Sequence, residues 1–160
     1  MHIEPGIAQG AKLLLGFGTA LTAGGLVLRQ CQEFLVQYGL STLLGRTICT
    51  SLLVFSFFEI FPSSPVGVSE VHLILGSTLF LLFGLVPTAL SLAIGLLAQG
   101  ILLAPLDLPQ YGMNVTTLLL PLFLVSAVAE RIIPRKTAYQ NLDYRQVLQL
   151  SLVYQGGIVS

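Results

Sequence analysis

The chain contains apolar stretches that are too long and too poorly charged for a soluble domain. Of its 160 residues, 54% are hydrophobic and 9% are charged, whereas soluble domains carry about 25% charged residues. Such stretches must face lipid, where helices satisfy every backbone hydrogen bond internally. The sequence therefore predicts an all-α, polytopic helical membrane protein. Its formal net charge is zero and it has no basic stripe, which excludes nucleic acid as a partner.

A helical span needs about 20 mostly apolar residues, and the apolar stretches predict about six transmembrane segments. Two interruptions rich in proline, glycine and serine separate some of them, Phe61–Val71 and Pro105–Gly112. The predicted segments are Gly6–Leu28, Leu43–Phe61, Val71–Leu85, Pro87–Leu103, Met113–Ile133 and Val147–Ser160. Because the last is shorter than a span, we expect a single membrane domain over residues 1–160 that is truncated at its C-terminal end.

Basic residues in short loops mark the cytoplasmic side of a membrane protein. With alternating spans they fall on one side, and the amino terminus lies outside with the acidic residues of the opposite loops. This pattern predicts a cell inner (cytoplasmic) membrane protein. The basic set is Arg29, Arg46, Arg131, Arg135, Lys136 and Arg145, and the outer acidic set is Glu4, Glu59, Glu70 and Asp107.

Two features of the first span bear on its packing. Lys12 lies inside it and must reach outward or find a partner. Small residues recur at every fourth position, at Gly16, Ala20 and Gly24, a spacing that allows two membrane helices to approach closely.

The two histidines of the chain, His2 and His72, fall on the outer side in this topology. The α-amine of Met1, the amide nitrogen of His2 and the His2 imidazole can chelate one metal ion, and His72 can supply a fourth nitrogen. Square-planar nitrogen ligation favours Cu(II) or Ni(II), and imidazole suits late first-row ions. The alternative is a solvated histidine near a terminus and a packing histidine at a helix start.

Several segments, in this order, resemble the CbiM/NikM family: MHI at the start, PVGVSEVHLILGS (Pro65–Ser77), AIGLLAQGILLAP (Ala93–Pro105) and GMNVTTLLLP (Gly112–Pro121). Members of this family are the substrate-capturing membrane subunits of energy-coupling-factor transporters for cobalt and nickel. The resemblance covers roughly residues 1–125. It implies that Met1, His2 and His72 hold the metal. The implied substrate is Co²⁺ or Ni²⁺, with no separate cofactor. The implied partners are a coupling membrane subunit, ATPase subunits and a small accessory membrane subunit.

The sequence departs from the family pattern near the ligands, which leaves the choice between cobalt and nickel open. Glu4 and Pro5 follow MHI in an unusual order, and Glu70 introduces a charge close to His72. Glu70 is a candidate to hydrogen-bond a ligating imidazole, or it is an ordinary acid at a helix N-terminus. Asn114 matches the family's loop asparagine and supports the site, or it caps a helix.

The chain has no GxxxxGK[ST] phosphate loop, so it cannot hydrolyse ATP itself. We expect a non-catalytic subunit that captures the metal outside and releases it inward. Two rival functions remain. One is an intramembrane hydrolase that uses Ser69 and His72, although GxSxG and HExxH motifs are absent. The other is a structural or assembly subunit without a ligand.

Overall fold

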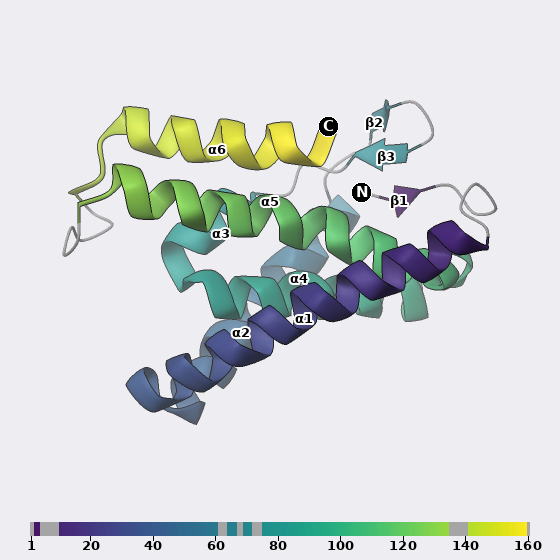
Figure 1. Cartoon of the computed structure of the whole chain (residues 1–160), viewed down its shortest axis with the longest axis horizontal. Helices are drawn as coiled ribbons and strands as arrows, with labels where there is room; N and C mark the ends of the chain where they lie inside the picture. Colours follow the sequence, from purple (N-terminus) through teal and green to yellow (C-terminus); the bar gives the residue numbers. More distant parts are fainter. Residues whose placement is uncertain are drawn as a thin grey trace.

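The computed structural model of the protein describes residues 2–3, 10–60, 64–66, 69–71, 75–134 and 141–159, with backbone alone at 2–3, 58–59, 64–66 and 69–71. The predicted helical architecture is confirmed, and three short strands that were not predicted accompany it (Figure 1). In chain order the elements are β1 (His2–Ile3), α1 (Ala11–Tyr38), α2 (Leu40–Ile60), β2 (Ser64–Val66), β3 (Ser69–Val71), α3 (Gly76–Phe83), α4 (Leu85–Leu102), the 3₁₀ helix η1 (Pro105–Gln110), α5 (Tyr111–Ile132) and α6 (Tyr144–Val159).

Four helical stretches within the described residues are long and apolar enough to cross a membrane. They are Ala11–Tyr38, Leu40–Phe57, Leu85–Leu102 and Pro105–Ile132. The 8 residues of α3 and the 16 of α6 are shorter than a span, because a helix rises about 1.5 Å per residue and the hydrocarbon core is about 30 Å thick. The six predicted segments thus correspond to six helices, four of which have the length of a span.

Helix α1 begins and ends later than the predicted span Gly6–Leu28. Gly10 precedes it at φ +56° and Gly39 follows it at φ +80°, conformations that glycine adopts most readily. The polar stretch after Leu28 continues the helix, which a hydropathy pattern does not reveal. Since α1 starts at Ala11, Lys12 lies in its first turn with an exposed side chain, so its charge sits at the end of the span.

The break between α3 and α4 falls where the sequence predicted it. Gly84, at φ +90°, ends α3 and precedes α4. Pro87 is then the third residue of α4, where its missing N–H is tolerated because first-turn amides have no intrahelical acceptor. Helix α3 starts at Gly76 rather than Val71, because Ser69–Val71 form the strand β3.

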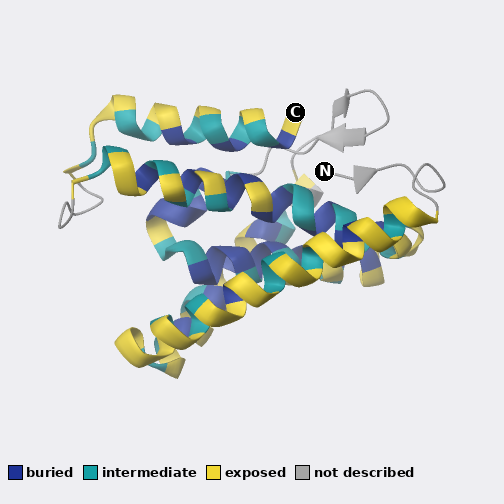
Figure 2. Ribbon diagram, in the orientation of Figure 1, coloured by how far each residue is buried: buried dark blue, intermediate teal, exposed yellow. Residues whose placement is uncertain are grey.

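The core lies along α4 and α5, whose inward faces carry most of the buried residues (Figure 2). Helix α2 packs on α4, and α1 and α6 pack on α5. Leu92, Leu118 and Leu122 are fully enclosed, whereas Leu21 and Val36 of α1 are 77% and 91% exposed. Exposed apolar side chains on spanning helices suit contact with lipid chains.

The start of α1 packs closely on the start of α5 through glycine. A β-carbon added at Gly16 would overlap the side chain of Met113, and one at Gly112 would lie 3.2 Å from the carbonyl oxygen of Gly16. At Gly24 it would meet no atom of the described residues within 4 Å. The predicted close approach is therefore confirmed at Gly16 and wrong at Gly24.

The arginines among the described residues are unevenly distributed between the two ends of the helical body. The α1–α2 turn, the α3–α4 turn and the facing ends of α5 and α6 lie at one end, and the sheet, η1 and the start of α5 lie at the other (Figure 1). The first end holds Arg46, Arg131 and Arg145, together with Glu33, Glu130 and Asp143. The described basic residues beyond the α1 start thus gather at the end that the charge pattern assigned to the cytoplasm.

Candidate metal centre

A small antiparallel sheet joins the start of the chain to the segment that precedes His72. The strand order is β1–β3–β2, with His2 opposite Glu70 and Ile3 opposite Ser69. On the other side of β3, Pro65 of β2 lies opposite Glu70. Proline is tolerated there because β2 is an edge strand. The sheet therefore places residue 2 opposite Glu70, which precedes His72 by two residues in the sequence.

The ligand set itself falls largely outside the described residues. Met1, His72 and Glu4 are not described, and His2 and Glu70 are described by backbone alone. Within the part of the chain whose side chains are described, no three histidine, cysteine, aspartate or glutamate residues gather as metal ligands would. The assignment of Met1, His2 and His72 as ligands therefore stays a prediction.

Strand β1 also contacts η1 and α5, and these elements bring polar side chains to its neighbourhood. Asp107 and Gln110 lie in η1, and Asn114 is the fourth residue of α5. Gln99 lies near the end of α4, which packs on η1. The three amides are buried, with exposed fractions of 7% for Gln99, 2% for Gln110 and 1% for Asn114. Burying an amide is costly unless it is hydrogen-bonded, so amides in this position favour a specific structural or binding role.

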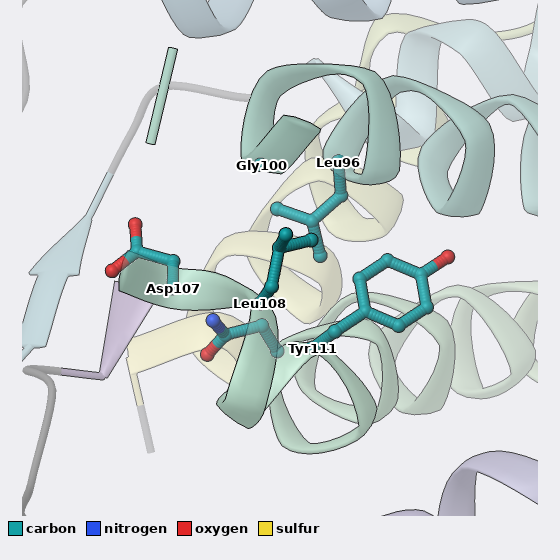
Figure 3. Close-up of a pocket in the computed structure, with 6 residues that line it drawn as sticks. Leu96, Gly100, Asp107, Leu108 and Tyr111 are labelled. Atoms are coloured by element: carbon teal, nitrogen blue, oxygen red, sulfur yellow. The ribbon is translucent and has the colours of Figure 1, made fainter. Parts of the chain in front are cut away.

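Asp107 and Asn114 line a pocket of about 10 Å³, room for no more than about one water molecule. Asp107 is its one charged lining residue among those described. The Asp107 carboxylate and the Tyr111 hydroxyl point to opposite sides of this pocket (Figure 3). The Tyr111 hydroxyl donates a hydrogen bond to the carbonyl oxygen of Ala93, 2.9 Å away, and so ties the start of α5 to α4.

Close packing of η1 on α4 depends on Gly100. A β-carbon there would lie 2.8 Å from Cδ2 of Leu108, so a larger residue would push η1 away from α4. This contact fixes the segment that carries Asp107 and Gln110.

The prediction that Asn114 caps a helix is wrong. Helix α5 begins at Tyr111, the residue before it is Gln110, and no side chain forms a capping hydrogen bond there. Asn114 is instead the fourth residue of the helix, with its side chain enclosed. A role in supporting β1 therefore remains for Asn114.

Sequence reasoning gave no role to Gln99 and Gln110. The available signal was an isolated amide within or beside an apolar segment, a residue type that is costly in a membrane and commonly functional. The fold adds that both amides are buried at the end of the molecule that carries β1.

Comparison with known proteins agrees with the resemblance in the sequence. Neither the curated proteins nor the solved structures contain a match. A family model described as the cobalt uptake substrate-specific transmembrane region, CbiM, matches residues 2–160, further along the chain than the quoted motifs reach. With its spanning helices and this match, the chain belongs to the CbiM family of substrate-specific membrane components for cobalt or nickel uptake.

Proposed function

We propose that this protein captures Co²⁺ or Ni²⁺ at the outer face of a cell membrane and passes the ion to partner subunits for ATP-driven uptake. The ligands are the Met1 α-amine, the amide and imidazole nitrogens of His2, and the His72 imidazole. The observation that carries the proposal is the β1–β3 register, in which His2 lies opposite Glu70. This pairing supports an encounter between the start of the chain and the segment that contains His72.

The chemistry of this donor set suits a late first-row ion. An incoming ion exchanges its water ligands for nitrogen, and a square-planar arrangement of four nitrogens is favourable for Ni(II). Each ligand must lose a proton before it binds. Metal affinity is therefore expected to fall as the pH falls.

The neighbouring residues would orient the ligands rather than bind the ion. A ligating imidazole commonly passes its second N–H to a carboxylate or carbonyl group, and Glu70 is close to both histidines in the sheet register or in sequence. Asn114, buried in the helix that contacts β1, would brace the strand. Asp107 adds negative charge on the same side, which raises the local concentration of cations.

Release follows from the small extent of β1. The strand contains two residues, so its detachment from β3 breaks few hydrogen bonds. The partners proposed to drive this step are a coupling membrane subunit and ATPase subunits, with a small accessory membrane subunit. The arginine-rich end, with Arg46, Arg131 and Arg145, would face them in the cytoplasm.

The rival functions have less support. A hydrolase would need Ser69 as nucleophile, and Ser69 lies in the middle strand of the sheet, paired on both sides. The CbiM family is a transport component, which favours a non-catalytic role. A purely structural subunit predicts that loss of either histidine has no effect on metal content.

The first experiment measures the metal content of purified protein with a native amino terminus after exposure to equal Co²⁺ and Ni²⁺. Elemental analysis should give one ion per chain, and visible absorption should report its geometry. His2→Ala, His72→Ala and one residue added before Met1 should each abolish binding, whereas Lys12→Ala, at the start of α1, should not. Metal retained with a blocked amino terminus would refute the proposed chelate, and no metal in any variant would support the structural rival.

A further inference from the structure

Helix α6 holds the first residues of α3 at two adjacent points. The ring of Tyr154 lies against Gly76, the first residue of α3, so closely that a β-carbon on Gly76 would overlap the ring. One turn earlier on α6, the hydroxyls of Ser151 and Ser77 share a hydrogen bond of 3.1 Å. Tyr154 is fully enclosed, and Ser77 is 3% exposed. The two contacts form a patch, named here the α6 clamp, of Gly76, Ser77, Ser151 and Tyr154.

The start of α3 depends on tertiary contacts, and the α6 clamp supplies those made by its first two residues. Isolated helices shorter than about 12 residues are marginal, and α3 has 8. The residue before it, Leu75, makes no side-chain capping hydrogen bond. The helix therefore starts where tertiary packing holds it, and Gly76 is the residue that lets the tyrosine ring approach.

The aromatic ring of Tyr154 packs against Gly76, whereas its hydroxyl forms no hydrogen bond to the described residues. The hydroxyl oxygen is buried and has no hydrogen-bond partner among the described residues, although burying a hydroxyl without one is unfavourable. Removing the oxygen should therefore leave the clamp intact, whereas removing the ring should open it. This difference allows the two to be separated by mutation.

Gly76 follows His72 by four positions in the sequence, and Val71, the residue before His72, ends β3. In the sequence, His72 therefore lies between the end of β3 and a helix start that α6 contacts. We infer that Tyr154 and Ser151 are positioning residues for His72, so that α6 determines whether the metal site is competent to bind. This inference rests on the proposed function.

The test enlarges the side chain at position 76 and then reduces the one at position 154. The measured quantity is the Kd for Ni²⁺ on the folded, monodisperse protein. Gly76→Ala should weaken binding by about 10-fold or more, the range seen when groups that support a metal ligand are lost. The double variant Gly76→Ala with Tyr154→Leu replaces the ring with a smaller side chain. Its Kd should return to within about 3-fold of the parent value, because the added methyl group then has space. Tyr154→Phe should bind within about 2-fold of the parent protein, since its hydroxyl has no partner to lose.

Controls separate positioning from general stability. Tyr144→Leu alters the same helix at a side chain that is 76% exposed, and it should leave both Kd and Tm unchanged. Ser151→Ala removes only the hydrogen bond to Ser77 and provides a milder variant, for which we expect weaker binding at a Tm near that of the parent. A role in stability alone would lower Tm and leave the Kd of the folded fraction unchanged.

The outcomes also distinguish the two proposals. If the parent protein binds Ni²⁺ and the folded clamp variants bind it equally well, the positioning role is wrong and the proposed function stands. If Gly76→Ala does not fold, the Kd of Ser151→Ala decides, and a parent-like value for that folded variant overturns the inference. If the parent protein binds no metal, the proposed function fails and this inference fails with it.

Discussion

The guanidinium Nη1 of Arg46 donates a hydrogen bond to the carbonyl oxygen of Phe83, 3.2 Å away. Arg46 lies near the start of α2, and Phe83 is the last residue of α3. The same guanidinium lies 5.9 Å from the ring centre of Phe34 and 5.6 Å from that of Tyr38. One cation therefore joins the end of α1, the start of α2 and the end of α3.

Arg46→Leu is expected to destabilise the protein by about 1–3 kcal/mol, because it removes a charged hydrogen bond and two cation–π contacts. Arg46→Lys should recover only part of this loss, since an ammonium lacks the planar fork. Thermal unfolding in detergent measures the effect, with Arg29→Leu, at an exposed position of α1, as the control. Because Arg46 lies at the end of the molecule opposite β1, the Kd for metal in the folded fraction should not change. A changed Kd would mean that the two ends are coupled.

Gly16 and Gly18 provide a matched pair on α1. Gly16→Ala places a methyl group against Met113 and should destabilise the protein by about 1–3 kcal/mol, the usual effect of overpacking. Gly18→Ala faces open space and should stabilise α1 by up to about 1 kcal/mol through helix propensity. Comparing the two Tm values tests the packing of α1 on α5. Equal effects would show that Met113 moves aside without penalty.

Asn114→Ala should weaken metal binding by about 10- to 100-fold, as expected for a residue that supports a ligand without touching the ion. The helical content should stay near that of the parent protein, as circular dichroism can verify. Leu120→Ala changes a residue of the same helix that is 68% exposed and should leave the Kd unchanged. Parent-like binding by Asn114→Ala would remove this residue from the proposed site.

Glu70→Gln tests whether a carboxylate beside the ligands matters for its charge. If Glu70 accepts a hydrogen bond from a ligating imidazole, the substitution should weaken binding by about 10-fold or more. If it acts only through long-range attraction, the loss should be smaller and should vanish at high salt. Titration with Ni²⁺ at two salt concentrations separates these results. An unchanged Kd at both concentrations would show that the charge of Glu70 has no part in metal binding.

The helices could be predicted because apolar stretches are read directly from the sequence. Where a helix extends beyond its apolar stretch, its end could not be predicted. The extension of α1 to Tyr38 depends on a polar helical segment outside the hydrophobic stretch and on Gly39 at positive φ. The sheet escaped prediction because strands of two and three residues have no measurable alternation. Their pairing depends on contacts between distant parts of the chain.

The candidate site was partly predictable for a similar reason. The histidines and Asn114 stand in segments that resemble a family, so sequence alone could single them out. The buried amides Gln99 and Gln110 became candidates only when the fold brought α4, η1 and β1 together. Burial of Asn114 also removed its capping role, a distinction that depends on where α5 begins.

Pro65 has a consequence for association between molecules. Exposed sheet edges recruit strands from neighbouring chains, and proline prevents this by removing a backbone donor. Pro65 lies in the edge strand β2, and the other edge strand, β1, contacts η1 and α5. Proline in one edge strand and the contacts of the other edge strand with helices both disfavour strand exchange and aggregation through the sheet.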